Sequence, residues 1–178
     1  MLEWVYLLYV ELNTSLDSMI SKHISYNEAI HSNTAKRCGI DNIPNEEQTN
    51  NMKMLAEKIF EPLRLWVGGA IKINSMFRSE ELNKAIGGAS SSQHCKGMAI
   101  DLDDVYGHKT NAEMYEWICS HCNFDQIIWE FGNDKNPSWI HVSYQSVDKN
   151  RNRVLLAEKE FGKTTYKIIK LYEIIYYQ

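Results

Sequence analysis

The chain has few prolines and cysteines and no long run of basic residues, so it lacks the features that mark disulfide-rich and nucleic-acid-binding proteins. Its 178 residues include three prolines and four cysteines, and its basic residues are scattered except for a short cluster at 149–153. The formal net charge is −4, so the surface offers no basic stretch to neutralise phosphates, and we expect no nucleic-acid partner. The length suits one domain with a real core, and we expect a single domain over residues 1–178.

The start of the chain lacks the marks of export and of membrane insertion. Its apolar stretch at 1–13 contains Glu3, and the first basic residue is Lys22. The stretch is too short to span a bilayer, and it has neither the basic start nor the small-residue cleavage site of a signal peptide. We therefore expect a cytoplasmic location in the producing cell and no stable membrane insertion. Action outside that cell would need another route of release.

The cysteines give no strong signal of a structural metal site. Only Cys119 and Cys122 have C-x-x-C spacing, and no second pair follows them. A structural zinc site usually has two such pairs. We therefore expect free thiols, which suit a reducing cytoplasm.

Apolar periodicity and turn residues predict a mixture of helices and strands. A stripe at helical spacing follows a capping Asn45, whereas residues 27–45 are rich in turn formers and predict a loop-laden arm. Two or three helices packed on a mainly antiparallel sheet would make an α+β domain. The expected helices are 46–65, a short one from Ser79 to Gly87, and 110–121; the expected strands are 70–77, 97–103, 125–131, 138–144, 153–158 and 165–176.

Three side chains form a candidate metal site. His94 lies in a loop before a strand of small residues, and Asp101 projects from the same strand face as Gly97 and Ala99. That pair alone is more often structural. His141, in the middle of an apolar strand, adds a second imidazole that needs a polar partner if it is buried.

Two imidazoles and one carboxylate, with an open position left for water or substrate, make the usual catalytic zinc arrangement. The same ligands also suit non-haem Fe(II) oxygenases. Those enzymes usually have the first histidine and the carboxylate closer in sequence, and they would need a co-substrate pocket with a further basic residue. Zinc is therefore the favoured metal.

The motif S-x-H-x-x-G-x-A-x-D at 92–101, followed by W-I-H-V-S at 139–143, resembles the zinc D-Ala-D-Ala peptidases. The likeness is to their short phage-type and bacterial murein-peptidase branch, whose fold is shared with hedgehog signalling domains. The resemblance extends over about residues 21–159, because three further segments also match in the same order. These segments are HSNTAKRCGIDNIP, LAEKIFEPLR and FRSEELNKAIGGASSSQH.

The resemblance implies that the three side chains bind Zn2+ and that an arginine, here Arg78, holds a substrate carboxylate. A planar guanidinium suits that role because it can donate two parallel hydrogen bonds. Ser92 and Gln93 lie beside the first ligand and could donate hydrogen bonds to a peptide carbonyl or to groups that support the metal ligands. The implied metal ligands are His94, Asp101 and His141.

The general base is less clear, because several relatives carry an acid three residues before the last histidine. That position is Ser138 here, and the nearest acids are Glu130 and Asp134. If Ile128 pairs with His141 in a hairpin, Glu130 shares the face of the histidine, and we expect it to be the base. A slip of one residue would put it on the opposite face. Asp134, on the turn, is the reserve candidate.

The resulting hypothesis is a zinc peptidase that hydrolyses a bond in peptidoglycan stem peptides or crosslinks. It would act as a D-Ala-D-Ala carboxypeptidase or an endolysin-type endopeptidase of a phage or prophage, and a holin-type partner would release it to the wall. The alternative is a non-catalytic zinc-containing module that binds cell wall or protein, as hedgehog domains do. An acid close to the metal would separate these two classes.

Overall fold

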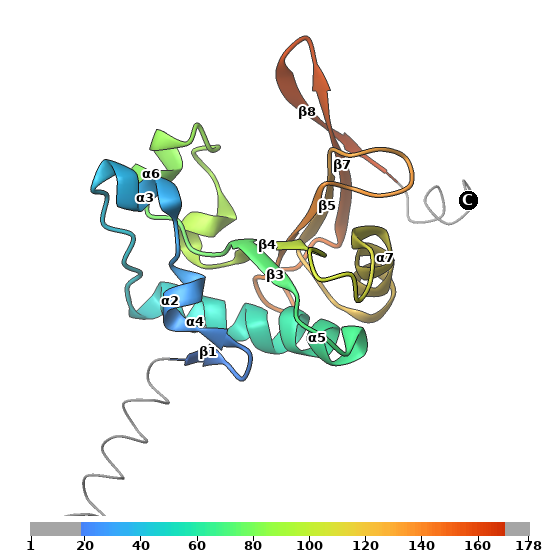
Figure 1. Cartoon of the computed structure of the whole chain (residues 1–178), viewed down its shortest axis with the longest axis horizontal. Coiled ribbons are helices and arrows are strands. Elements are labelled where there is room, and N and C mark those ends of the chain that lie inside the picture. Colours follow the sequence, from blue (N-terminus) through green and yellow to red (C-terminus); the bar gives the residue numbers. More distant parts are fainter. Residues whose placement is uncertain (1–18, 170–178) are drawn as a thin grey trace, which may run out of the picture.

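The computed structural model describes residues 19–169 and has a six-stranded sheet at its centre, with strand order β3-β4-β6-β5-β7-β8 (Figure 1). A small two-stranded sheet precedes it, formed by β1 (Met19–Ser21) and β2 (Ile24–Ser25). The central strands are β3 (Lys72–Ser75), β4 (Ala99–Asp103), β5 (Gln126–Glu130), β6 (Trp139–Ser143), β7 (Arg153–Glu160) and β8 (Lys163–Ile168).

The expected α+β class is confirmed, but the sheet is mixed, because β5 and β7 pair in parallel while the other neighbours are antiparallel. Parallel strands usually need a long crossover. Here β6 returns the chain to the end of the sheet where β5 begins. The segment 144–152 therefore reaches the start of β7 without an intervening helix.

The predicted helix at 46–65 is observed as one continuous helical run. Asn45 and Gln48 form a reciprocal capping box at its start. The run consists of α4 (Glu46–Leu55), the π-helical turn η1 (Ala56–Phe60) and α5 (Glu61–Val67). The other predicted helices are observed as α6 (Glu80–Ala85) and α7 (Asn111–His121), and a 3-10 turn η2 (Gln93–Lys96) precedes β4.

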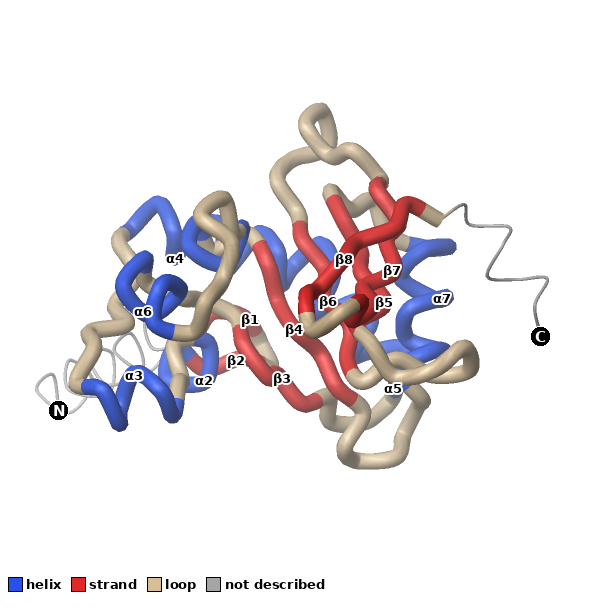
Figure 2. Tube along the Cα trace, turned by 90° about the horizontal axis from the view of Figure 1, so that it is seen from above, coloured by secondary structure: helices blue, strands red, loops and turns tan. Residues whose placement is uncertain are grey.

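The turn-rich arm at 27–45 contains two short helices that the sequence analysis read as loop. They are α2 (Tyr26–Ala29) and α3 (Asn33–Cys38). Each begins after a serine, Ser25 or Ser32, whose hydroxyl accepts a hydrogen bond from a backbone N–H of the first turn. Figure 2 shows α2, α3 and α6 gathered beyond the β3 edge, with β7 and β8 at the opposite edge.

Side chains alternate between the two faces of the central sheet, and one face is more apolar than the other. Ile100 and Leu102 in β4 join the main core with the apolar stripe of α4, η1 and α5 and with α7. The residue between them, Asp101, points to the opposite face. That second face carries the candidate metal ligands and a smaller apolar cluster of Ile128, Leu155 and Ala157.

Two sequence predictions fall on termini beyond the described range. The apolar segment at 1–13 lies outside it, as does the part of the expected strand 165–176 that follows residue 169. Within residues 19–169, no helix has the length and apolar character to span a bilayer.

Candidate metal centre

Three adjacent elements present the candidate ligands to one point. His94 comes from η2, Asp101 from the middle of β4, and His141 from the middle of β6, where it pairs directly with Asp101. Gly97 makes the turn between η2 and β4 with a φ of +68°, and a Cβ there would lie 2.3 Å from the carbonyl oxygen of Gln48. Only glycine suits both the positive φ and the close approach of the Gln48 carbonyl, which explains the glycine in the motif.

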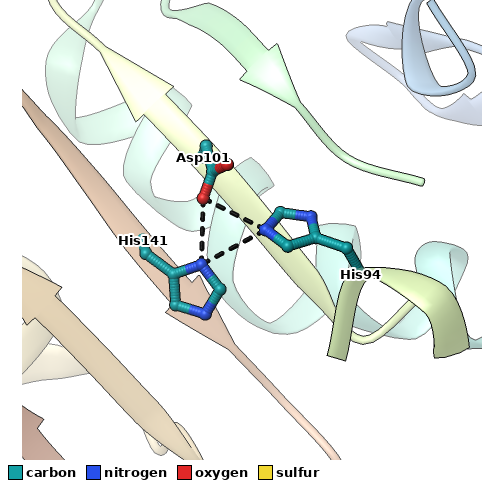
Figure 3. A group of neighbouring side chains, drawn as sticks. All are labelled: His94, Asp101 and His141. Atoms are coloured by element: carbon teal, nitrogen blue, oxygen red, sulfur yellow. Dashed lines mark hydrogen bonds and ion pairs between the residues drawn. The ribbon is translucent and has the colours of Figure 1, made fainter. Parts of the chain in front are cut away.

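The distances between the three ligand atoms fit a small metal ion. His94 Nε2 lies 3.2 Å from Asp101 Oδ1 and 3.3 Å from His141 Nδ1, and the last two atoms are 2.9 Å apart (Figure 3). Zinc bonds of about 2.0–2.1 Å in a tetrahedron place neighbouring ligand atoms about 3.3 Å apart. The donor set and its spacing therefore suit Zn2+, and among the described residues these three form a group that could hold a metal ion.

Protonation also favours a cation between these atoms. The Nδ1–H of His94 donates to the backbone carbonyl of Met76 at 2.7 Å, so its Nε2 presents a lone pair to the site. Burial lowers the pKa of His94, which keeps the ring neutral. Burial opposes ionisation of Asp101, but its interactions with His94 and His141 prevail and hold its pKa well below the usual range. Both pKa shifts favour the unprotonated forms that a metal ion requires of its ligands.

Arg78 lies against the candidate ligand Asp101 rather than standing free in the groove. Its Nη2 donates to Asp101 Oδ2 at 2.5 Å, and its Nε donates to Ser75 Oγ at 2.8 Å. The guanidinium therefore orients the oxygen of Asp101 that does not face the histidines. Two of its five N–H groups are used in this way, and the role of Arg78 in holding a substrate carboxylate stays a prediction.

Glu130 lies on the predicted face. Ile128 pairs with His141 and Glu130 with Trp139, which is the register expected from the sequence. Burial raises the pKa of Glu130 to about 7, and the charge of Asp101 contributes in the same direction, while His141 and Arg78 oppose it. Such a carboxyl group can accept and release a proton near neutral pH, as a general base must.

Glu130 and the three candidate ligands line one groove of about 950 Å³ on the polar face of the sheet. Asp134, the reserve candidate, is exposed on the turn between β5 and β6 and lines a separate cavity with Trp129 and Leu156. Ser138 is also exposed. The geometry thus brings Glu130, and not Asp134, to the groove that contains the candidate ligands.

Ser92 and Gln93 both line this groove, but the amide nitrogen of Gln93 is already engaged. It donates to Asp125 Oδ2 at 2.9 Å. Asp125 is fully buried and also accepts from Gln145 Nε2 at 2.8 Å and from Arg151 Nε and Nη2 at 2.8 and 2.5 Å. This carboxylate, which the sequence analysis missed, ties the turn bearing His94 to the start of β5.

We expect Asp125→Asn to lower the free energy of unfolding by about 2–4 kcal/mol, because the variant leaves Arg151 without its buried partner and places an amide among donors. Urea denaturation of the metal-free protein measures the change. Asp148→Asn makes the same chemical change on an exposed turn and should alter stability by less than about 0.5 kcal/mol. Equal losses in the two variants would contradict a structural role for Asp125.

Comparison with known protein families supplies the deciding observation. The family model described as Peptidase M15 matches residues 22–143, which is more than half of the chain and includes all three candidate ligands and Glu130. The chain belongs to the peptidase M15 family. A search of curated proteins found no match.

Family membership confirms the expected relation to the zinc D-Ala-D-Ala peptidases. M15 peptidases are zinc-dependent hydrolases, so the family and the His-Asp-His cluster together identify the class as metallopeptidase. The match begins near residue 21, as expected, but it ends at residue 143 with β6, before the expected end near residue 159. Strands β7 and β8 lie beyond it.

Proposed function

We propose that this M15 family member is a Zn2+-dependent peptidase that hydrolyses a peptide bond in peptidoglycan stem peptides or crosslinks. The observation that carries the proposal is the convergence of His94 Nε2, Asp101 Oδ1 and His141 Nδ1 in a groove that Glu130 also lines. An acid near the metal ligands supports catalysis over the non-catalytic binding module.

The chain's own residues would divide the work as follows. Bound Zn2+ supplies an activated water and polarises the scissile carbonyl. Glu130 accepts a proton from the attacking water and delivers it to the leaving amine. Arg78 holds Asp101 in place, and its remaining N–H groups orient a substrate carboxylate, which contributes positioning rather than chemistry. Ser92 hydrogen-bonds the peptide backbone beside His94.

Two finer parts of the proposal concern which peptide bond is cut and where the protein is made and acts. The bond is either the terminal D-Ala-D-Ala bond, in a carboxypeptidase, or an internal bond of the stem or crosslink, in an endolysin-type endopeptidase. We further propose a phage or prophage origin, synthesis in the cytoplasm and release to the wall by a holin-type partner. These parts rest on the resemblance of the motifs to the short phage-type branch of the family.

Digestion of purified peptidoglycan tests the proposal. The zinc-loaded protein should release new stem-peptide fragments, identified by mass spectrometry, and these should name the bond that is cut. Removing the metal with EDTA should reduce the rate at least about 100-fold, and adding Zn2+ back should restore it. A protein that binds one zinc per chain and releases no fragment would instead support the binding module.

A further inference from the structure

The groove around the candidate metal centre is more basic than the protein as a whole. Its charged lining consists of four basic and two acidic side chains, in a chain whose formal net charge is −4. An excess of positive charge in a groove favours anionic ligands. The basic residues are Arg78, Lys96, Arg151 and Arg153, and the acidic ones are Asp101 and Glu130.

The cations in this groove are not equally available to a ligand. Arg78 pairs with Asp101, and Arg151 pairs with the buried Asp125. The guanidinium of Arg153 makes no hydrogen bond or ion pair with any residue in the range 19–169, although the residue is half-buried. Among the described residues nothing neutralises this guanidinium, so it is available to an anionic ligand.

Strand register places Arg153 on the face of the metal ligands. It pairs with Gln126 across the parallel β5–β7 ladder, while Leu155, two residues on, lies in the row of Ile128 and His141. Strand spacing of about 4.8 Å and a rise of about 3.3 Å per residue put its Cα roughly 12 Å from that of His141. The guanidinium is therefore within reach of a short peptide bound at the metal centre.

A carboxylate is the anion that this position suits best. The amide of Gln126 lies on the same face as the guanidinium and also lines the groove, so the two side chains can hold one carboxylate together. We propose that Arg153, assisted by Gln126, binds a second carboxylate of the substrate, the α-carboxylate of the γ-linked D-glutamate in a stem peptide. This inference rests on the proposed function, because it names a subsite for that substrate.

The subsite would also extend beyond the segment that the family model matches. Gln126 lies inside the segment that matches the family model, whereas Arg153 opens β7, ten residues beyond its end. On β8, Thr164 and Tyr166 continue the lining of the groove on the same side. The β7–β8 hairpin thus adds a wall, and with it a charge, to the site carried by the family segment.

Two synthetic stem peptides test the subsite. Both have the sequence L-Ala-γ-D-Glu-L-Lys-D-Ala-D-Ala, with the glutamate α-carboxylate free in one and amidated in the other. For the free peptide, Arg153→Gln should raise KM about 10-fold or more with little change in kcat, because a charge-assisted hydrogen bond is lost on binding. For the amidated peptide, wild type and Arg153→Gln should have equal KM values.

Lys149→Gln is the matched control, since it removes a positive charge from an exposed turn outside the groove. It should leave the preference for the free carboxylate unchanged, and the zinc content of both variants should equal that of wild type. Equal KM values of wild type for the two peptides would overturn the inference while leaving the peptidase intact. If wild type cuts neither peptide nor purified peptidoglycan, the proposed function fails, and calorimetric binding of the two peptides then decides the subsite alone.

Discussion

Glu130→Gln should lower kcat for peptide hydrolysis by about 10²- to 10⁴-fold, the usual contribution of a general base. Glutamine has nearly the same size and shape as glutamate, but its amide group cannot accept a proton from water. Because Glu130 is not one of the three converging ligands, the variant should still bind one zinc ion per chain. Steady-state kinetics on a stem peptide, together with metal analysis, measures both quantities.

Asp134→Asn is the matched control for this experiment. It makes the same carboxylate-to-amide change on an exposed turn that faces a different cavity, so we expect near-normal activity. Loss of activity in Asp134→Asn with retention in Glu130→Gln would assign the base to Asp134. Full activity in both variants would remove the carboxylate base from the mechanism.

The pH dependence of kcat/KM is a second test of Glu130 as the general base. A base must be deprotonated to act, so kcat/KM should rise with pH through the pKa of this group and then level off. Burial raises that pKa to about 7 in the metal-free protein, and the positive charge of bound Zn2+ would lower it. The midpoint of the acidic limb should therefore fall below 7, and the limb should be absent from the residual activity of Glu130→Gln.

Local sequence patterns predicted the part of the fold that carries the site. The sequence could suggest a hairpin with Ile128 opposite His141 but could not fix that register, because both strands are buried on both faces. The structure has this register. The parallel pairing of β5 with β7 was not predictable in the same way. It depends on contacts between distant segments, and an apolar strand pattern does not reveal which neighbour it will find.

The site shows the same division between local pattern and long-range contact. The motif residues could be grouped from spacing and resemblance, but the engagement of Arg78 by Asp101 depends on how β3 and β4 meet. Asp125 was passed over as the first residue of an apolar strand. An acid at such a position was a usable signal, since a buried carboxylate requires several donors, and the structure supplies them from Gln93, Gln145 and Arg151.

His141→Ala should abolish hydrolysis by removing one of three candidate metal ligands. We expect zinc affinity to fall by more than about 100-fold, because loss even of a residue that only supports a ligand commonly costs 10- to 100-fold. Calorimetric titration of the metal-free protein with Zn2+ measures the affinity. The stabilisation that zinc gives to the folded state should fall with it, and the Tm with and without zinc reports that loss.

The Tm also separates loss of the metal from loss of the fold. In the metal-free protein His141 interacts with Asp101, whose negative charge stays buried in the variant, so some destabilisation is expected without any metal. What identifies a metal ligand is the disappearance of the zinc-dependent rise in Tm. His31→Ala, which removes an exposed histidine outside the groove, should keep that rise. Should His141→Ala keep it as well, zinc would be bound elsewhere, and the convergence of the three side chains would be a buried polar network rather than a metal centre.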